Sequence, residues 1–315
     1  MLKRLSRNNM LGAASLCLGA LVFSMQDSAI KSISGTEAVT LAIVFRAAVS
    51  LPILTIMVAA RGGLGHLQDS QWRLLLLRGA ILLVSYTAYF MAFPALPLAE
   101  AIALYFMVPL IVTLLAGPML GERVGWKSWA AVGLGLIGVF VILRPGTALF
   151  NPAALLSLIS AGAYAVAQLL ARKYGGGTQA SVMAFYQNAV YLVGAAAIAG
   201  LVMALGLKPP GHPSLDFLFR AWAWPSLHDA LVMGVCGVIA AFGSTLLANA
   251  YRIGTASVVT PFEYTGMIWA VTFGFLFFGE VPRATTILGM ALIAVAGILA
   301  LRAAAVPLKA SDIQA

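Results

Sequence analysis

Charged side chains are scarce in this sequence. Asp, Glu, Lys and Arg together make up 9% of the 315 residues, whereas hydrophobic residues make up 62%. A soluble domain carries about 25% charged residues, so a chain this poor in charge cannot cover an ordinary water-facing surface. The scarcity excludes the soluble globular class and predicts an integral membrane protein.

Cysteine and histidine are also rare, which bears on metal and catalytic chemistry. The two cysteines, Cys17 and Cys236, lie in apolar runs without metal-binding or redox spacing. The three histidines fall in or near predicted loops, without the His/Asp clustering that a hydrolase or a metal site needs. The sequence also lacks a Gly-x-x-x-x-Gly-Lys-Ser/Thr motif. We therefore expect no cofactor, no metal, no enzymatic activity and no direct coupling to ATP.

Apolar runs dominate what is present. A bilayer core needs about 20 apolar residues per helix, and runs rich in Ala, Leu, Gly and Val without strict alternation favour helices over a β-barrel. The sequence predicts ten transmembrane helices at 10–30, 37–59, 75–95, 99–119, 127–143, 152–172, 179–205, 229–250, 256–278 and 284–302.

The cations indicate how these helices are oriented. With the N-terminus placed in the cytoplasm, most of the 19 Lys and Arg residues fall on that side, which is the positive-inside pattern. Ten spans then return the C-terminus to the cytoplasm. The net charge of +9 is thus interpreted as orienting the protein rather than binding nucleic acid. Residues 1–25 resemble a signal peptide but lack a small-x-small cleavage site, so we expect a retained first helix.

The chain also repeats itself. A shift of 142 residues aligns Gln26 with Gln168, and a shift of 158 aligns Glu122 with Glu280, each directly after a glycine. Each half holds five helices, and because five is odd, the second half enters the membrane from the opposite side. We interpret each of these glutamates as capping or salt-bridging a helix end.

The predicted fold is therefore an all-α integral membrane protein with ten transmembrane helices arranged as two inverted five-helix repeats. The first repeat covers residues 1–149 and the second covers residues 150–315. Inverted repeats suit alternating access, because one unit in two orientations gives two related packings.

Three segments resemble the EamA-type repeats of the drug/metabolite transporter superfamily. They are PLAEAIALYFMVPLIVTLLAGPMLGERVGWKSWAAVGLGLIGVFVILRPG (97–146), ASVVTPFEYTGMIWAVTFGFLFFGEVP (256–282) and VFRAAVSLP (44–52). The resemblance covers residues 10–302. It implies a ten-helix transporter of the bacterial inner membrane, in which the fifth and tenth helices are peripheral and the others line a central cavity. It leaves the substrate open.

Arg46 lies ten residues inside the second predicted helix, where a charge costs about 2.5–3.5 kcal/mol on insertion scales. It is a candidate anchor for an anionic group or a partner for a mobile carboxylate. The alternative is a structural role, in which it pairs with Asp27 or a backbone carbonyl.

Glu263 follows Pro261 in the ninth predicted helix. Proline removes a helix hydrogen bond, so we expect a locally irregular helix there. A carboxylate at such a break is a candidate coupling group for protons, as is Asp27, which alternatively forms an interfacial pair with Lys31. The alternative for Glu263 is a hydrated residue that locks helix packing.

Further polar and aromatic side chains inside the predicted helices are candidates for lining a solute cavity. Small-molecule sites combine apolar walls with few polar groups, although each such aromatic taken singly more often packs the core. The candidate substrate-binding residues are Gln26, Arg46, Tyr86, Tyr89, Phe90, Tyr105, Tyr164, Gln168, Asn188, Tyr264 and Trp269.

The function expected from these features is a secondary carrier of small organic metabolites, such as amino acids or related compounds, acting as an exporter. The alternative within carriers is uptake of a nucleoside-like or vitamin-like metabolite. From other classes, an intramembrane enzyme lacks clustered catalytic residues, and a channel lacks a ring of like charge. The expected partners are the solute, the lipid bilayer and protons, with the chain acting as a monomer or a homodimer through its small-residue fifth helix.

Overall fold

The computed structural model describes residues 7–60, 63–68, 71–121, 125–147, 150–174, 178–253 and 260–304. Within these residues the secondary structure is helical, and no strand occurs. Nine of the described helical segments are long and apolar enough to cross a membrane, and Phe262–Phe278 is a shorter apolar segment. The predicted all-α membrane fold is confirmed.

The helices follow the predicted apolar runs closely, because run length alone sets where a helix can span. The helices of the first half are α1 (Arg7–Ile33), α2 (Val39–Ala60), η1 (Leu64–Leu67), α3 (Trp72–Ala92), α4 (Leu98–Tyr105), α5 (Val108–Leu120) and α6 (Trp126–Leu143). Those of the second half are α7 (Ala154–Tyr174), α8 (Ala180–Ala204), α9 (Pro213–Phe219), α10 (Leu227–Ile253), η2 (Thr260–Tyr264), α12 (Thr265–Phe278) and α13 (Ala284–Ala304).

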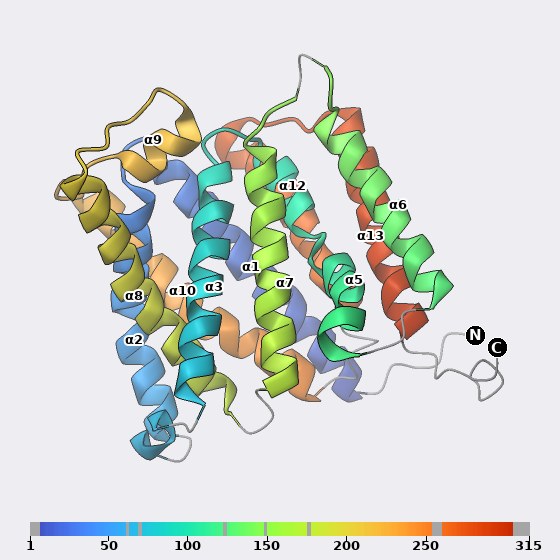
Figure 1. Cartoon of the computed structure of the whole chain (residues 1–315), viewed down its shortest axis with the longest axis horizontal. Coiled ribbons are helices and arrows are strands. Elements are labelled where there is room, and N and C mark those ends of the chain that lie inside the picture. Colours follow the sequence, from blue (N-terminus) through green and yellow to red (C-terminus); the bar gives the residue numbers. More distant parts are fainter. Residues whose placement is uncertain are drawn as a thin grey trace.

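The helix packing follows the relation between the two halves. Helix α1 of the first half packs on α10 of the second, and their equivalents in the opposite halves, α7 and α3, also pack on each other. Helices α2 and α6 each pack on their own equivalents, α8 and α13. Helices α1 and α7, the first of each half, run in opposite directions through the bundle (Figure 1). This is the arrangement expected of inverted repeats, while the boundary between residues 149 and 150 stays a prediction.

The fourth span of each half is broken at an equivalent position. Helix α4 ends at Tyr105 and α5 begins at Val108, just before Pro109, whose missing N–H suits a first helical turn. In the second half the 3₁₀ turn η2 gives way to α12 at Thr265, as predicted for the region of Pro261. The shift of 158 places Phe106 on Tyr264, and these two rings lie 5.4 Å apart. Residues 254–259 lie outside the described part.

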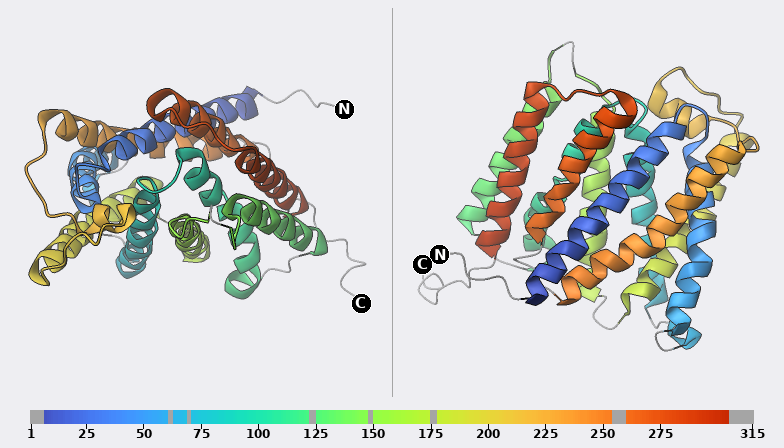
Figure 2. Two further views of the ribbon diagram at one scale, coloured as in Figure 1. Left: turned by 90° about the horizontal axis from the view of Figure 1, so that it is seen from above. Right: turned by 180° about the vertical axis from the view of Figure 1, so that it is seen from behind.

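The pair α6 and α13 lies at one edge of the bundle, as the family resemblance implies (Figures 1 and 2). A Cβ on Gly138 would lie 2.9 Å from the carbonyl oxygen of Gly289, so glycine is required for this close approach. The small residues of α6 therefore serve packing within the chain. Arg144, at the end of α6, forms an ion pair with Glu100 of α4 (3.1 Å), and Thr286 of α13 donates to the same carboxylate (2.7 Å).

The helix bundle has two ends. The end at which α1 begins and α13 ends is called the terminal end. The opposite end, at which α1 and α12 end and α9 lies, is called the distal end (Figure 2).

Candidate functional site: a buried arginine and tyrosine cluster

Arg46 is buried in α2, with 4% of its surface exposed. Its Nε donates to Oε1 of Gln26 on α1 (3.1 Å), and Nε2 of Gln26 donates to the hydroxyl of Tyr86 on α3 (2.6 Å). The guanidinium also lies over the Tyr86 ring at 4.5 Å and near the Tyr191 ring at 5.9 Å. An amide and two aromatic faces thus stabilise a charge that apolar surroundings would otherwise exclude.

A second arginine, also in the first half of the chain, has the same kind of environment. Nη2 of Arg78 on α3 donates to Oε1 of Gln168 on α7 (3.4 Å), and Nε2 of Gln168 donates to the hydroxyl of Tyr164 (2.9 Å). Gln168 is the repeat equivalent of Gln26. We call these two groups the Arg46 triad (Arg46, Gln26, Tyr86) and the Arg78 triad (Arg78, Gln168, Tyr164).

Aromatic rings connect the two triads. The Tyr86 ring lies 4.4 Å from Phe90, which lies 5.9 Å from Tyr89. From there the contacts run to Tyr105 at 4.7 Å and on to Tyr164 at 5.7 Å. The two triads and these rings form one continuous cluster inside the bundle, which we call the tyrosine cluster. It brings together eight of the eleven residues predicted to bind substrate.

Asp27 belongs to the same cluster. It is 7% exposed, and its Oδ2 accepts a hydrogen bond from the hydroxyl of Tyr89 (2.9 Å). No ion pair joins it to Arg46 or Lys31 among the described residues. The ion pairs of Asp27 that were considered as alternatives do not form, because Arg46 bonds the Gln26 amide and Lys31 reaches across the bundle to another carboxylate.

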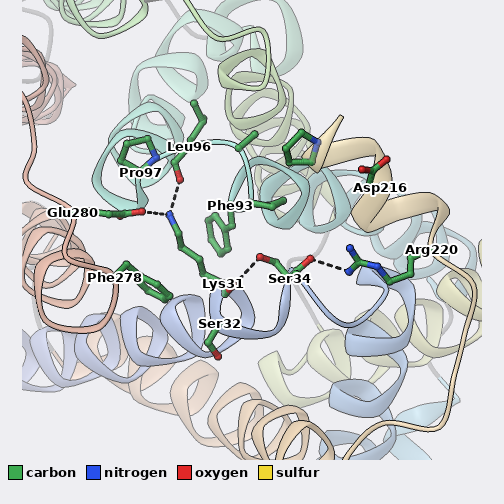
Figure 3. Close-up of a pocket in the computed structure, with 14 residues that line it drawn as sticks. Lys31, Ser32, Ser34, Phe93, Leu96, Pro97, Asp216, Arg220, Phe278 and Glu280 are labelled. Carbon is green, nitrogen blue, oxygen red and sulfur yellow. Dashed lines mark hydrogen bonds and ion pairs between the residues drawn. The ribbon is translucent and has the colours of Figure 1, made fainter. Parts of the chain in front are cut away.

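That carboxylate is Glu280, and the contact closes part of the distal end (Figure 3). Gly279 adopts φ 65° and ends α12, which turns the chain so that Glu280 faces α1. The Lys31 ammonium forms an ion pair with Glu280 and donates to the Leu96 carbonyl (2.6 Å), while Oε2 of Glu280 accepts from the Leu98 amide (2.7 Å). This is a helix-end ion pair of the kind predicted for Glu280, whereas Glu122 lies outside the described residues.

A pocket of about 660 Å³ lies at the distal end, beside this ion pair. The ends of α1 and α12, the α3–α4 connection and α9 line it (Figure 3). On one side Arg220, the residue directly after α9, donates to the backbone carbonyls of Ser34 (3.0 Å) and Glu37, which holds α9 on the α1–α2 turn. Another lining residue, Phe93, is fully buried and packs on Tyr89 with ring centroids 4.8 Å apart. The pocket is thus separated from the tyrosine cluster by one aromatic layer and the Lys31–Glu280 pair.

Three predicted binding residues are not members of the tyrosine cluster, and one of them, Tyr264, is connected to it through Phe106, whose ring lies 6.4 Å from Tyr105. Asn188 accepts a hydrogen bond from Ser50 (2.8 Å) and so joins α8 to α2. Tyr264 packs on Phe106, and Trp269 stacks on Phe273 along α12 at 6.0 Å.

Glu263, the predicted coupling residue, lies in η2 and is half-buried. It is close enough to Tyr164 and Tyr264 to interact with both electrostatically. It therefore borders the Arg78 side of the tyrosine cluster, and its coupling role stays a prediction.

Two residues of the site were missed from sequence. Arg78 follows the cations at the start of the third helix, so it was interpreted as orienting the protein, yet its guanidinium contacts Gln168. Tyr191 is fully buried, donates to the Leu82 carbonyl (3.2 Å) and faces both Tyr86 and Arg46. Nothing in the local sequence distinguishes Tyr191 from a core tyrosine, and the repeat does not point to Arg78, because the repeat equivalent of Arg46 is Asn188.

Comparison with known proteins finds similar proteins among transporters. Residues 10–144 match the EamA-like transporter family. The chain is 25% identical over 291 residues to the pseudopaline exporter CntI of Pseudomonas aeruginosa, covering 90% of this chain and 94% of that protein. It is 28% identical over 288 residues to the riboflavin transporter of Vibrio cholerae, covering 90% of each chain. It is 25% identical over 217 residues to the S-adenosylmethionine uptake transporter of Rickettsia prowazekii, covering 69% of this chain and 67% of that protein.

A solved crystal structure shares the fold along nearly the whole chain. Its TM-score is 0.57 at 18% identity, over 99% of this chain and 100% of the other. The relatives are named as transporters, and the multi-span helical architecture agrees with them. The first half of the chain is thus similar to EamA-like transporters of the drug/metabolite transporter superfamily, and the chain as a whole is similar to proteins named as transporters.

Proposed function

We propose that the protein is a secondary carrier that exports small organic metabolites, such as amino acids or related compounds, across the bacterial inner membrane by alternating access. The observation that carries the proposal is the pair of triads, whose glutamines are related by the repeat, joined by a buried aromatic cluster. Inverted repeats place the two glutamines toward opposite faces of the membrane, and each glutamine holds one arginine there.

The Lys31–Glu280 pair supports an alternating mechanism because it joins elements of both halves. Lys31 belongs to the first half and Glu280 to the second, and both bond the α3–α4 connection. Closure of the distal end therefore depends on contacts that a relative movement of the halves would break. In this proposal the conformation described here is closed at the distal end.

The orientation follows from the distribution of cations. With the terminal end in the cytoplasm, the distal pocket with Lys31, Arg220, Asp216 and Glu280 faces the periplasm. In an exporter this pocket is the exit vestibule, and the terminal end is where the solute enters.

Uptake is the second candidate, and the names of the relatives favour it in part. One relative is named as an exporter, another as an uptake transporter for S-adenosylmethionine and a third as a riboflavin transporter. A vitamin-like or nucleoside-like solute taken up through the same tyrosine cluster would use the same residues in the reverse order.

Counterflow in proteoliposomes tests the proposal. A thermal-shift screen against a metabolite library first selects a solute, because a ligand that binds the native state raises its melting temperature. Vesicles loaded with that solute unlabelled are then diluted into a trace of labelled solute. A carrier accumulates the label transiently by exchange, whereas a channel only equilibrates it and an enzyme alters the compound. Equilibration without overshoot in vesicles that contain folded protein contradicts the proposal.

A further inference from the structure

We propose that the solute is an organic anion, and that its acidic group binds in turn at Arg46 and at Arg78. This inference rests on the proposed carrier function and names the substrate class for the same cluster. It derives from donors that the protein itself leaves unused at both arginines.

The first observation is one unsatisfied donor in each triad. Nη1 of Arg46 and Nε of Arg78 are buried and have no hydrogen-bond partner among the described residues. Among the described residues, no carboxylate lies within ion-pair distance of either arginine. A buried guanidinium N–H without an acceptor is unfavourable, and a carboxylate is the acceptor whose planar geometry fits a guanidinium best.

The second observation is that each guanidinium is already held in place. Gln26 accepts from Nε of Arg46, and Gln168 accepts from Nη2 of Arg78, so one nitrogen of each guanidinium is fixed while another stays free. The Tyr86 ring packs against the flat face of Arg46. An incoming acid would therefore meet donors that are ordered beforehand, which lowers the entropic cost of binding.

The third observation is the separation of the two arginines. Arg78 and the Tyr86 that packs on Arg46 are eight residues apart on α3, which corresponds to about 12 Å along the helix axis. The two triads therefore lie at different depths in the bundle, and in this proposal they act as successive subsites. Arg46 lies closer to the distal end and Arg78 closer to the terminal end, since α2 begins and α3 ends at the distal end.

The rings between the subsites indicate the rest of the solute. Tyr105, Tyr164 and Tyr191 offer flat apolar faces together with hydroxyl groups. Flat aromatic walls favour a planar or aromatic body. The structure thus assigns the solute to planar organic acids, with the acid at one arginine in each access state.

Matched pairs of acids and their neutral amides test this assignment on the purified full-length protein. The probes are indole-3-acetate, nicotinate, benzoate and N-acetyltryptophan, each compared with its amide in a thermal-shift titration. We expect at least one acid to raise the melting temperature, with an apparent affinity at least tenfold tighter than that of its amide. Arg46→Gln and Arg78→Gln should each weaken that acid at least tenfold and leave the amide unchanged.

Two further variants control for folding and for charge. Arg73→Gln removes an exposed cation on the same helix and should change neither affinity. Arg46→Lys keeps the charge without the fork of donors and should bind the acid less tightly than the unsubstituted protein but more tightly than Arg46→Gln. If Arg46→Gln fails to give a monodisperse protein, Arg46→Lys and Arg78→Gln decide the outcome.

Three results would overturn the assignment. They are amides that bind as tightly as their acids, a panel in which no acid binds, and acid binding that survives substitution of both arginines. None of these results would remove the carrier function, because counterflow of a neutral or cationic solute would still demonstrate exchange.

Discussion

At the scale of single residues, the tyrosine cluster shows how a charge is kept inside a membrane protein without a direct ion pair among the described residues. Arg46 is held by one amide oxygen and by aromatic faces, and the tyrosine that accepts from the same amide completes the triad. Such an environment provides an acceptor for one N–H donor of the guanidinium and leaves another N–H donor for a ligand. An arginine in a closed ion pair, such as Arg144 with Glu100, serves structure instead.

Replacing Gln26 by leucine tests the role of that amide. The substitution removes the acceptor of Arg46 and should lower the free energy of unfolding by about 1–3 kcal/mol, since a donor of a charged group is left unsatisfied. Gln187→Leu removes a hydrogen bond between two neutral groups, Gln187 and Tyr191, and should cost about 1 kcal/mol. Thermal unfolding of both variants in one detergent measures the difference. Equal losses would show that Gln26 does not support the charge of Arg46.

Glu37 gives a prediction for pH. Burial, with the Asp229 carboxyl close by, raises the pKa of Glu37 above its usual value of 4.5. The folded protein therefore binds more protons than the unfolded chain at pH values just above 4.5, so this residue makes stability fall as the pH rises through that window. Melting temperatures measured from pH 4 to 8 should decline less steeply in Glu37→Gln than in the unsubstituted protein. Identical slopes would contradict this account of the α1–α2 turn.

Glu263 is the residue at which proton coupling is most simply tested. Glu263→Gln preserves size and hydrogen bonding but removes the titratable proton. If the carrier couples to protons here, the variant should keep counterflow near the unsubstituted rate and lose accumulation driven by a pH gradient. Asp27→Asn is the matched comparison, because Asp27 is the second candidate for the coupling group. Full pH-driven accumulation in Glu263→Gln would leave this glutamate a structural role.

At the scale of elements, helix positions could be predicted because the length of an apolar run determines a span. The 3₁₀ turn near Pro261 followed from the chemistry of proline. The short helix α9 could not be predicted, because its seven residues lie in a connection without apolar periodicity and dock through Arg220 onto the α1–α2 turn. Contacts of this kind depend on tertiary structure.

Because the fourth span is broken, we expect a substitution that makes this helix continuous to lower the transport rate. Pro109→Ala restores a backbone N–H and allows α4 to continue into α5, which would displace Phe106 from Tyr264. We expect counterflow to fall about tenfold while the melting temperature stays equal or rises, because proline breaks in carriers provide hinges rather than stability. Pro118→Ala, near the end of α5, is the matched control and should transport normally. Unchanged counterflow in Pro109→Ala would remove the hinge role.

At the scale of the whole molecule, the repeat was the most informative feature of the sequence. It aligned Gln26 with Gln168 before their partners were known, and the structure gives each of them an arginine and a tyrosine. The sequence alone could not supply Arg78 and Tyr191 as site residues, since their roles arise from the crossing of α3 with α7 and α8. The repeat relates the two glutamines, whereas helix packing determines which arginine and which tyrosine each glutamine contacts.

The same register predicts a second ion pair. Lys173 is the equivalent of Lys31, and Glu122, which lies outside the described residues, is the equivalent of Glu280. We expect Glu122 and Lys173 to close the terminal end in the state in which Lys31 and Glu280 separate. Removing the Glu280 carboxylate should therefore favour opening of the distal end, and removing the Glu122 carboxylate should favour opening of the terminal end.

The central claim is that the two ends open in alternation, and one distance measurement tests it most directly. Spin labels at Ser32 and Val281 flank the Lys31–Glu280 pair, in a background with Cys17 and Cys236 replaced by alanine, and double electron–electron resonance in nanodiscs reports their separation. The account predicts a short distance for the parent protein, a second and longer population in Glu280→Gln, and a more uniformly short distance in Glu122→Gln. A distribution that is the same in all three proteins, or that lengthens in both variants, would contradict alternating access through this bundle.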